Sequence, residues 1–565
     1  MTRKRQILTH YIIPIAIVII GLWLLFTSKA YFRVDLTSEK RYTISESTRN
    51  LLSANEKPLH ATLYLCGNLD ANMLRLSHAA EDMIAEMNGY CRPRIIVNHI
   101  DPNDASSDDM RYALYTQLEN RGLRGMNVTM RQRGGKMAEQ IIFPWAELSS
   151  ATDTVQICLM QPSGQTSGEE AVNMAIEDLE FQFADAIRIL TSKNAKRVAF
   201  IEGHGEWSEE EVYDATDALS RYFYVDRGVL AHDASILDAY SAIIIAGPKT
   251  PYSESDKYII DQYIMRGGRV LWMIDGTQTS AKMLSSNGST PLIANDVNLS
   301  DMLFRYGVRI TPSVIEDMQC AYIPVNIARP GDEPRFEPIP WFYTPLLQTS
   351  PLHPITKTIG SVRADFASGI EIVGDTLTSR KSLLLASSNA SHVGFAPNAI
   401  NVSDAIDVEP KEYFNNAYIP VAVGIEGQFT SIFRHRMIPD GIVGSQQISK
   451  SSETRMVVVS DADIIRNDIE QHAEGLMVVP LGFDRLTQHS YGNRDFIVNT
   501  MLYLTDDEGV MNLRNKQIEL RLLNRAVTDT HRTAIIVSAI TLPLVLLALF
   551  AIVYILIHRR KSIRL

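Results

Sequence analysis

The chain has 565 residues, of which 45% are hydrophobic and 21% are charged, and its formal net charge is −11 at pH 7. This acidic balance, with no Lys/Arg stripe in the interior, argues against a nucleic-acid partner. The four cysteines show neither C-x-x-C nor zinc-like spacing, so no metal and no cofactor are expected. A bond between Cys66 and Cys91 would need an oxidising compartment, and buried thiols are the simpler interpretation.

An apolar segment runs from Ile7 to Phe26, and a helix needs about 20 apolar residues to cross a bilayer. We therefore predict a cytoplasmic tail at 1–6 and a transmembrane helix at 7–28. A cleaved signal peptide is the alternative, because Ser28-Lys29-Ala30 resembles a cleavage site. The length of the apolar run and Trp23 near its end favour a membrane span.

The next range, 29–190, is predicted to be a small α/β ectodomain with a roughly thioredoxin-like layout. Apolar residues recur at helical spacing within 69–87, which predicts a helix covering one face of a sheet. Glycines at 134 and 135 suggest the turn of a hairpin. The other predicted elements are strands at 60–66, 94–100 and 154–160, hairpin strands at 126–131 and 139–148, and a helix at 169–190.

A larger α/β ectodomain is predicted at 191–510. Its near-continuous apolar strands alternate with helices, which favours a doubly wound parallel sheet of flavodoxin-like or glutamine-amidotransferase-like type. The proline-bearing stretch 287–352 is interpreted as excursions from that sheet. The predicted strands are 195–202, 223–229, 241–246, one within 267–276, 381–387, 427–433 and 455–460, and the predicted helices are 208–221, 253–266 and 493–503.

Beyond this domain, 511–533 is predicted to be an amphipathic juxtamembrane helix that faces lipid, solvent or a partner. The segment 534–557 has no charged residue and precedes a basic tail at 558–565. We predict a second transmembrane helix there. Because short basic tails dominate the positive-inside rule, both tails are expected in the cytoplasm and the ectodomain in the periplasm, with the chain held in the inner membrane.

Glu202, His204 and Glu206 alternate with glycines at the end of the predicted strand 195–202. Two carboxylates flanking an imidazole suit a metal site or an acid/base pair. Structurally, the glycines also permit a tight turn, and acidic residues are favoured near a helix N-terminus. The spacing matches neither H-E-x-x-H nor G-x-G-x-x-G, so these residues are candidates for binding a ligand or partner.

Asp275, Asp461 and Asp463 each follow a predicted strand. The carboxyl ends of parallel strands meet at one sheet edge, where ligands bind, so a divalent ion or another ligand is one interpretation. Aspartates at strand ends also terminate strands and cap helices. All three are therefore candidate ligand- or partner-binding residues, with no metal assigned.

Lys249 lies in Gly247-Pro248-Lys249-Thr250, which lacks the upstream glycine of a P-loop. The chain therefore supplies no P-loop ATPase chemistry, and Lys249 is a ligand or partner candidate. No G-x-S-x-G nucleophile elbow occurs either. No catalytic residue is assigned, and the chain is not expected to be an enzyme.

Six motifs occur in the order of one known family. They are Asp35-Leu36-Thr37 with Tyr42, IIFPWAEL at 141–148, VAFIEGHGEW at 198–207, the run at 243–275, VVVSDADII at 457–465 and NLRNKQIELRLLN at 512–524. The chain resembles the gliding-motility-associated ABC-transporter auxiliary proteins of Bacteroidetes, the GldG family, often labelled substrate-binding. One departure is Ala462, where that family often has glycine between the two aspartates.

The resemblance implies an accessory subunit beside a separate ABC permease and a separate ABC ATPase. The ectodomain also resembles a domain of a eukaryotic intraflagellar transport component for which sugar binding has been suggested, so an envelope glycan joins an unknown substrate as a candidate ligand. The leading expectation is a non-ATPase subunit whose ectodomain binds a partner or substrate. The alternatives are a membrane-tethered envelope enzyme, which requires the candidate side chains to converge in a cleft, and a carbohydrate-binding scaffold.

Overall fold

The computed structural model describes residues 44–513, except 106, 132–136, 152, 161–167, 192–195, 327, 329–332, 375–378, 406–409, 444–445, 473–474, 508 and 512, together with 537, 541–543 and 545. The chain divides into two compact units, 1–516 and 517–565. The predicted span 7–28 and nearly all of 511–557 lie outside the described residues. Within the described ranges, no helix has the length and apolar character needed to cross a membrane.

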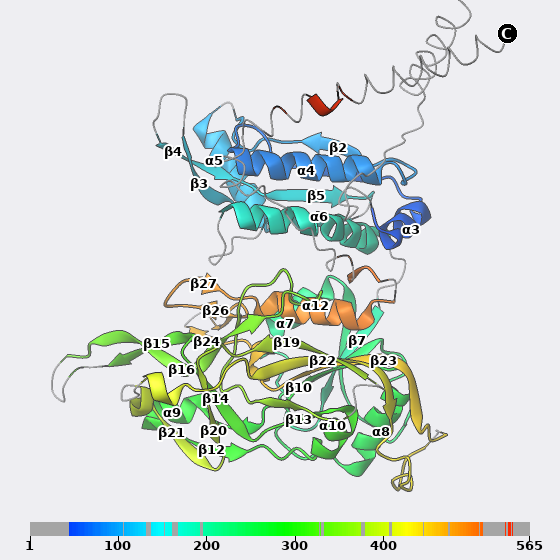
Figure 1. Cartoon of the computed structure of the whole chain (residues 1–565), viewed down its shortest axis with the longest axis vertical. Helices are drawn as coiled ribbons and strands as arrows, with labels where there is room; N and C mark the ends of the chain where they lie inside the picture. The colour runs from blue at the N-terminus through cyan, green and yellow to red at the C-terminus, as the bar shows by residue number, and fades with distance from the viewer. Residues whose placement is uncertain are drawn as a thin grey trace, which may run out of the picture. The chain divides into compact units, whose positions relative to one another are not determined.

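Residues 44–191, here called the N-terminal region, contain a four-stranded sheet in the order β2-β1-β5-β6. Strands β1 and β2 are parallel, whereas β5 is antiparallel to both β1 and β6. Helices α4 and α6 contribute to one apolar core and α5 to a second one (Figure 1). The bounds are β1 His60–Leu63, α4 Ala71–Met87, β2 Ile96–His99, α5 Asp108–Asn120, β5 Trp145–Ser149, β6 Thr154–Cys158 and α6 Gly168–Thr191.

Two features of the N-terminal region differ from the sequence prediction. The predicted strand 139–148 is two strands, because Pro144 interrupts it: β4 (Met137–Ile142) forms a hairpin with β3 (Met126–Arg131), and β5 joins the four-stranded sheet. Helix α5 was not predicted, although Ser107 caps it. The short helix α3 (Glu46–Ala54) is capped by Ser45, whose side chain accepts a hydrogen bond from the backbone N–H of Thr48.

Residues 196–513, here called the larger region, are built on a ten-stranded sheet in the order β15-β16-β19-β22-β23-β10-β9-β7-β8, with β17 paired to β16. Strands β8, β7, β9, β10 and β23 are parallel, whereas β22, β19, β16 and β15 extend the sheet antiparallel. The predicted parallel sheet is thus one half of a mixed sheet. The bounds are β7 Lys196–Glu202, β8 Phe223–Val229, β9 Ala242–Ala246, β10 Val270–Met273, β15 Cys320–Asn326, β16 Phe336–Thr349, β17 Val362–Arg363, β19 Ser379–Ala386, β22 Pro420–Thr430 and β23 Lys450–Val459.

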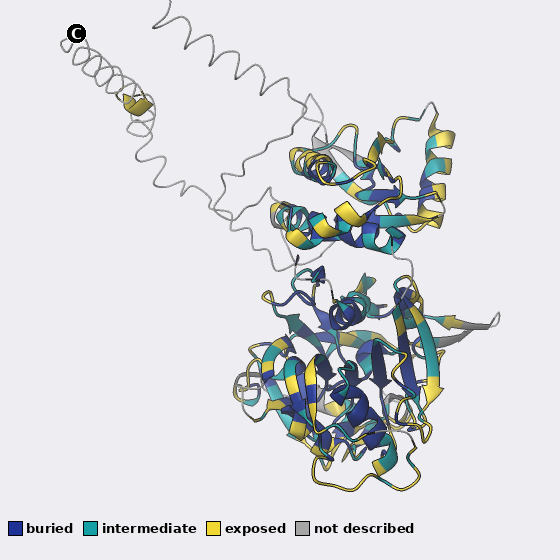
Figure 2. Ribbon diagram, turned by 90° about the vertical axis from the view of Figure 1, so that its right-hand side faces the viewer, coloured by how far each residue is buried: buried dark blue, intermediate teal, exposed yellow. Residues whose placement is uncertain are grey.

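Helices cover both faces of this sheet. Helices α7 (Tyr213–Ser220) and α12 (Asn493–Thr505) share one apolar core with the strands, and α8 (Glu254–Met265) and α10 (Ser300–Tyr306) share the other. Every residue of β9 and β10 is buried, as expected for strands covered on both sides (Figure 2). The resemblance to thioredoxin-like and flavodoxin-like folds stays a prediction.

Two predictions for the larger region are wrong. Helix α7 begins at Tyr213 rather than at 208, because 209–212 forms turns. The stretch 287–352 is not a set of irregular excursions, because it contains β15 and the 14-residue strand β16. Prolines lack the N–H that a ladder uses, so Pro338 and Pro340 obscured β16 in the sequence.

The remaining elements of the larger region are short and lie outside the ten-stranded sheet. They are β11 Thr277–Gln278, α9 Ala281–Asn287, β12 Ser289–Ala294, β13 Val308–Ile310, β14 Ser313–Asp317, β18 Ile370–Ile372, β20 Ser391–Phe395, β21 Asn398–Asn401, η2 Val402–Ala405, α11 Pro410–Tyr413, η3 Asp463–Ile465, β24 Ile469–His472, β25 Gly475–Val478, β26 Phe483–Asp484 and β27 His489–Ser490.

Candidate functional site

Three of the predicted aspartates meet where β10 and β23 end. These strands are parallel neighbours, so their carboxyl ends lie side by side. Asp275 Oδ1 accepts a hydrogen bond from the backbone N–H of Ala462 at 2.7 Å. Asp461 accepts two, from the N–H groups of Asp463 at 2.7 Å and Asp365 at 2.8 Å. The aspartates therefore fix the loop after β23 and tie it to the segment after β17.

Burial disfavours the charged form of these carboxyls. Desolvation raises the pKa of Asp275 to about 6 and that of Asp463 to about 7. It also raises the pKa of Asp461 well above its usual range, and the charges of Asp463, Asp275 and Asp365 act in the same direction. Asp275, Asp461 and Asp463 therefore titrate as an interacting group, above the usual range of an aspartate.

Two guanidinium groups offset part of this negative charge. Arg466 donates a hydrogen bond to Asp463, and Arg363 forms an ion pair with Asp365, with Nη2 and Oδ2 3.4 Å apart. Arg363 Nε is buried without a hydrogen-bond partner. Within the described ranges, no three His, Cys, Asp or Glu side chains are grouped so as to hold a metal ion.

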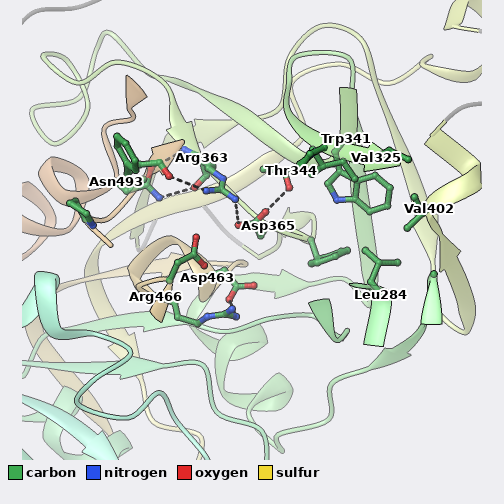
Figure 3. Close-up of a pocket in the computed structure, with 18 residues that line it drawn as sticks. Leu284, Val325, Trp341, Thr344, Arg363, Asp365, Val402, Asp463, Arg466 and Asn493 are labelled. Carbon is green, nitrogen blue, oxygen red and sulfur yellow. Dashed lines mark hydrogen bonds and ion pairs between the residues drawn. The ribbon is translucent and has the colours of Figure 1, made fainter. Parts of the chain in front are cut away.

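A cavity of about 540 Å³ opens beside this group, within the range of about 300–1,000 Å³ typical of small-molecule sites (Figure 3). Trp341 lies on one side with Val325, Val402 and Leu284. The cavity is lined by Leu284, Gly288, Ile323, Pro324, Val325, Trp341, Thr344, Arg363, Asp365, Phe366, Val402, Asp463, Arg466, Asp468, Pro480, Gly482, Phe483 and Asn493. One wall is thus apolar and the other is rich in carboxylates and guanidinium groups.

Phe366, which lines the cavity, has a left-handed backbone with φ of 55°. A bulky residue in this region is strained, at a cost of about 1–3 kcal/mol, and such residues cluster at functional sites. Its N–H donates to the carbonyl of Tyr343 at 2.8 Å, and the two rings stack with centroids 6.2 Å apart. These contacts with β16 hold the half-buried Phe366 ring at the cavity.

Of the seven predicted candidates, only Asp463 lines this cavity, while Asp275 and Asp461 support it from behind. An enzyme using these aspartates with Glu202 and His204 would need them in one cleft, and the cavity lining contains only one of them. The cavity therefore does not bring Glu202 and His204 together with the aspartates, as that alternative requires.

His204 and Glu206 belong to a separate polar network at the end of β7. The His204 ring stacks on Tyr252 with centroids 3.6 Å apart, and Tyr252 donates a hydrogen bond to Glu206 at 2.6 Å. Burial lowers the pKa of His204, but Glu206 and Asp256 outweigh it and the net pKa is raised. Burial would raise the pKa of Glu206, but hydrogen bonds from His204 and Tyr252 lower it. Each charge has a partner in the network, which favours a structural role.

The other two candidates lie around Trp207. Glu202 accepts a hydrogen bond from Arg227 at 2.8 Å and does not join the His204 network. The Lys249 ammonium lies 3.8 Å from the centroid of the Trp207 ring, a cation–π contact. Trp207 Nε1 donates to the carbonyl of Ala462 at 3.0 Å. Lys249 thus supports the loop after β23 through Trp207.

Most of the cavity wall was not predicted from the sequence. Arg466 lies three residues beyond Asp463, and this spacing in the sequence could have indicated an ion pair between them. Arg363, Asp365, Phe366 and Trp341 come from a stretch without clear periodicity, so only the tertiary structure assembles them.

Comparisons with known proteins agree with this division of the chain. A family model described as an ABC-type uncharacterized transport system, ABC_transp_aux, matches residues 195–500. A model for a domain of unknown function, DUF7088, matches residues 38–149. An uncharacterized protein of Borreliella burgdorferi (strain ATCC 35210) is 21% identical over 530 residues, which cover 91% of each chain.

Similarity to solved structures is weak. The chain is similar to the structure titled mmIFT52 N-terminal domain, with 11% identity and a TM-score of 0.31, over 55% of this chain and 98% of that one. Similarity to Gan42B, a GH42 beta-galactosidase from G. stearothermophilus, has a TM-score of 0.18 at 10% identity, over 76% of this chain and 58% of that one. Neither similarity carries an argument about function.

The ABC_transp_aux match spans more than half of the 565 residues and contains every residue that lines the cavity. The comparisons do not single out the GldG family within it. The chain belongs to the ABC_transp_aux family and is an auxiliary component of an ABC-type transport system.

Proposed function

We propose that the chain is a non-ATPase membrane subunit of an ABC transport complex related to the gliding-motility transporter, and that its larger region binds a ligand outside the cytoplasm. The cavity carries this proposal, because all its lining residues lie inside the family match. Its volume, its apolar wall and its convergent polar groups are those of a small-molecule site.

The apolar segments at 7–28 and 534–557 support anchoring in the inner membrane at two points. A subunit anchored in this way would be held over its partner membrane subunits. The basic residues that precede the first segment and follow the second support a periplasmic ectodomain. The partners are then a separate permease and a separate ATPase.

Purification of the tagged full chain from its native host after cross-linking tests the role as a subunit. We expect a multi-span permease and a P-loop ATPase to co-purify in mild detergent. The same host carrying an equally abundant, unrelated two-span protein with the same tag is the control. Recovery of the chain without either protein would reject the proposal.

A carbohydrate-binding scaffold is the second candidate function. The side chain of Thr344 donates to Asp365 Oδ1 at 2.5 Å beside the aromatic Phe366, and hydroxyl-rich ligands use such mixtures of polar groups and rings. Binding of uncharged oligosaccharides to the full chain, with transport unchanged in a binding-deficient variant, would favour this role.

A further inference from the structure

The charges around the cavity are not balanced by direct contacts. Arg363 is paired with Asp365, and Arg466 is paired with Asp463. Asp468 also lines the cavity, and its carboxylate makes no hydrogen bond or ion pair with the described part of the chain. The charge left without a direct partner is therefore negative.

Asp468 lies within the electrostatic reach of both guanidinium groups, and it acts together with the paired carboxylates to raise the pKa of Arg363 and of Arg466. An incoming anion would meet three lining carboxylates and two guanidinium groups, each already paired with a carboxylate, although the buried Nε of Arg363 has no hydrogen-bond partner among the described residues. An uncharged ligand that covered Asp468 would remove water from its carboxylate and return no counter-charge. A cation would supply the missing counter-charge.

The apolar wall of the cavity determines which kind of ligand body can bind. The side chains of Leu284, Val325 and Val402 have no polar atoms, and the half-buried ring of Phe366 is held in place by its contacts with Tyr343. Apolar surface gains free energy when such a wall covers it, and an aromatic face also attracts a cation. The cavity therefore suits a molecule with an apolar body and a charged end.

We propose that this cavity binds an organic cation, a primary amine or a related ammonium compound with an apolar body, whose charged end lies by Asp468 and whose body contacts Phe366. This inference deepens the proposed function and rests on it, because it takes the cavity to be the site where the subunit meets its ligand.

Three probes that share an indole ring and differ in the end group test the proposal: tryptamine is a cation, tryptophol is uncharged and indole-3-propionate is an anion. Binding to the full chain in detergent is measured by calorimetry at about pH 7.5. We expect tryptamine to bind at least about tenfold more tightly than tryptophol, and indole-3-propionate to bind most weakly.

Two variants assign the effect to the cavity. D468N should weaken tryptamine binding about five- to tenfold and should not weaken tryptophol binding, because it removes charge and keeps the shape. D440N, at an exposed loop position, is the matched control and should bind like the wild type. F366G removes the ring, permits the left-handed backbone and should weaken binding of tryptamine and tryptophol alike.

The outcomes separate the two proposals. Equal or tighter binding of tryptophol or indole-3-propionate that still depends on Phe366 would overturn the cationic ligand and leave the cavity as a ligand site. The same holds if D468N binds tryptamine like the wild type. If no probe binds, the cationic ligand is overturned. If F366G binds every probe as the wild type does, the cavity is not the binding site and both proposals fail.

Discussion

Each region of the molecule buries a carboxylate at its sheet, but the two regions neutralise it differently. In the N-terminal region, Glu147 accepts hydrogen bonds from Tyr64, at 2.7 Å, and from Arg121. In the larger region, Asp461 accepts hydrogen bonds from two backbone N–H groups and lies among other carboxyls. The first carboxylate is paired with a cation, whereas burial and neighbouring carboxyls disfavour the charged form of the second.

The difference shows that a buried carboxyl beside a sheet can either be neutralised within the fold or leave an electrostatic field for a ligand. A buried carboxylate with both a cation and a phenol is satisfied within the fold and gains nothing from a ligand. Carboxyls that share too few cations lower the stability of the fold and leave a field that a ligand can complete. This difference supports the proposal that the larger region binds the ligand.

The largest expected effect comes from removing the cation in each region. R466M leaves the carboxyls around Asp463 without their nearest counter-charge and should lower the free energy of unfolding by about 2–3 kcal/mol at about pH 8. R121M should cost about 1 kcal/mol, because Arg121 is 40% exposed and its charge is screened by water. Denaturation of the full chain in detergent measures both losses.

Repeating the denaturation of R466M and R121M at acidic pH provides the control. At about pH 5 Asp463, the direct partner of Arg466, holds its proton because its pKa is about 7, so the loss in R466M should shrink there. If R466M and R121M lose the same free energy of unfolding at both pH values, the two regions do not neutralise their carboxylates differently.

The second prediction concerns pH. Asp275 has a pKa of about 6, above the value of about 3.8 expected in the unfolded chain, so the folded state binds more protons between these values. Stability contributed by this proton is therefore lost as the pH rises from about 4 through 6. The other charged groups facing the cluster are Asp461, Asp463, Asp365, Arg466 and Lys249.

D275N keeps the oxygen that accepts from Ala462 and removes the charge. Over this pH range its stability should fall by about 1–3 kcal/mol less than that of the wild type. Urea midpoints at several pH values measure the difference, and contributions from His204 and Glu206 cancel in it. Parallel curves for D275N and the wild type would show that Asp275 is ionised throughout.

The smallest expected effect is that of Y64F. The substitution removes the hydroxyl that donates to Glu147 and should lower the free energy of unfolding by about 1 kcal/mol. Because Arg121 still pairs with Glu147, the loss should be the same at about pH 5 and pH 8. A loss that grows with pH would mean that the N-terminal region also holds an excess of negative charge.

The sequence predicts the parallel half of the larger sheet well, because the apolar runs of β7, β9 and β10 are continuous and punctuated by glycine. It predicts from the same pattern that Asp275 and Asp461 meet. It fails for β16, where three prolines conceal a strand, and for helix α7, where turn residues precede Tyr213. These failures matter for function, because β16 supplies Trp341 and Thr344 to the cavity.

The cavity itself could not be predicted from the sequence. Phe366 has a left-handed backbone, and its N–H bonds to the carbonyl of Tyr343 on β16, which is a tertiary contact. The pairing of Arg363 with Asp365 places both charges in the wall, but which of them face a cavity depends on the packing of α12 and η2. Asp463 was identified because it follows a strand, and Asp468 was not identified because it follows a turn of 3₁₀ helix.

Hydrogen–deuterium exchange of the full chain, with and without saturating tryptamine, tests the central claim that the larger region holds the ligand site. We predict slower exchange in 363–368 and 461–468, with no change in 44–191. Protection confined to 44–191, or no protection at tryptamine concentrations that saturate binding, would contradict it.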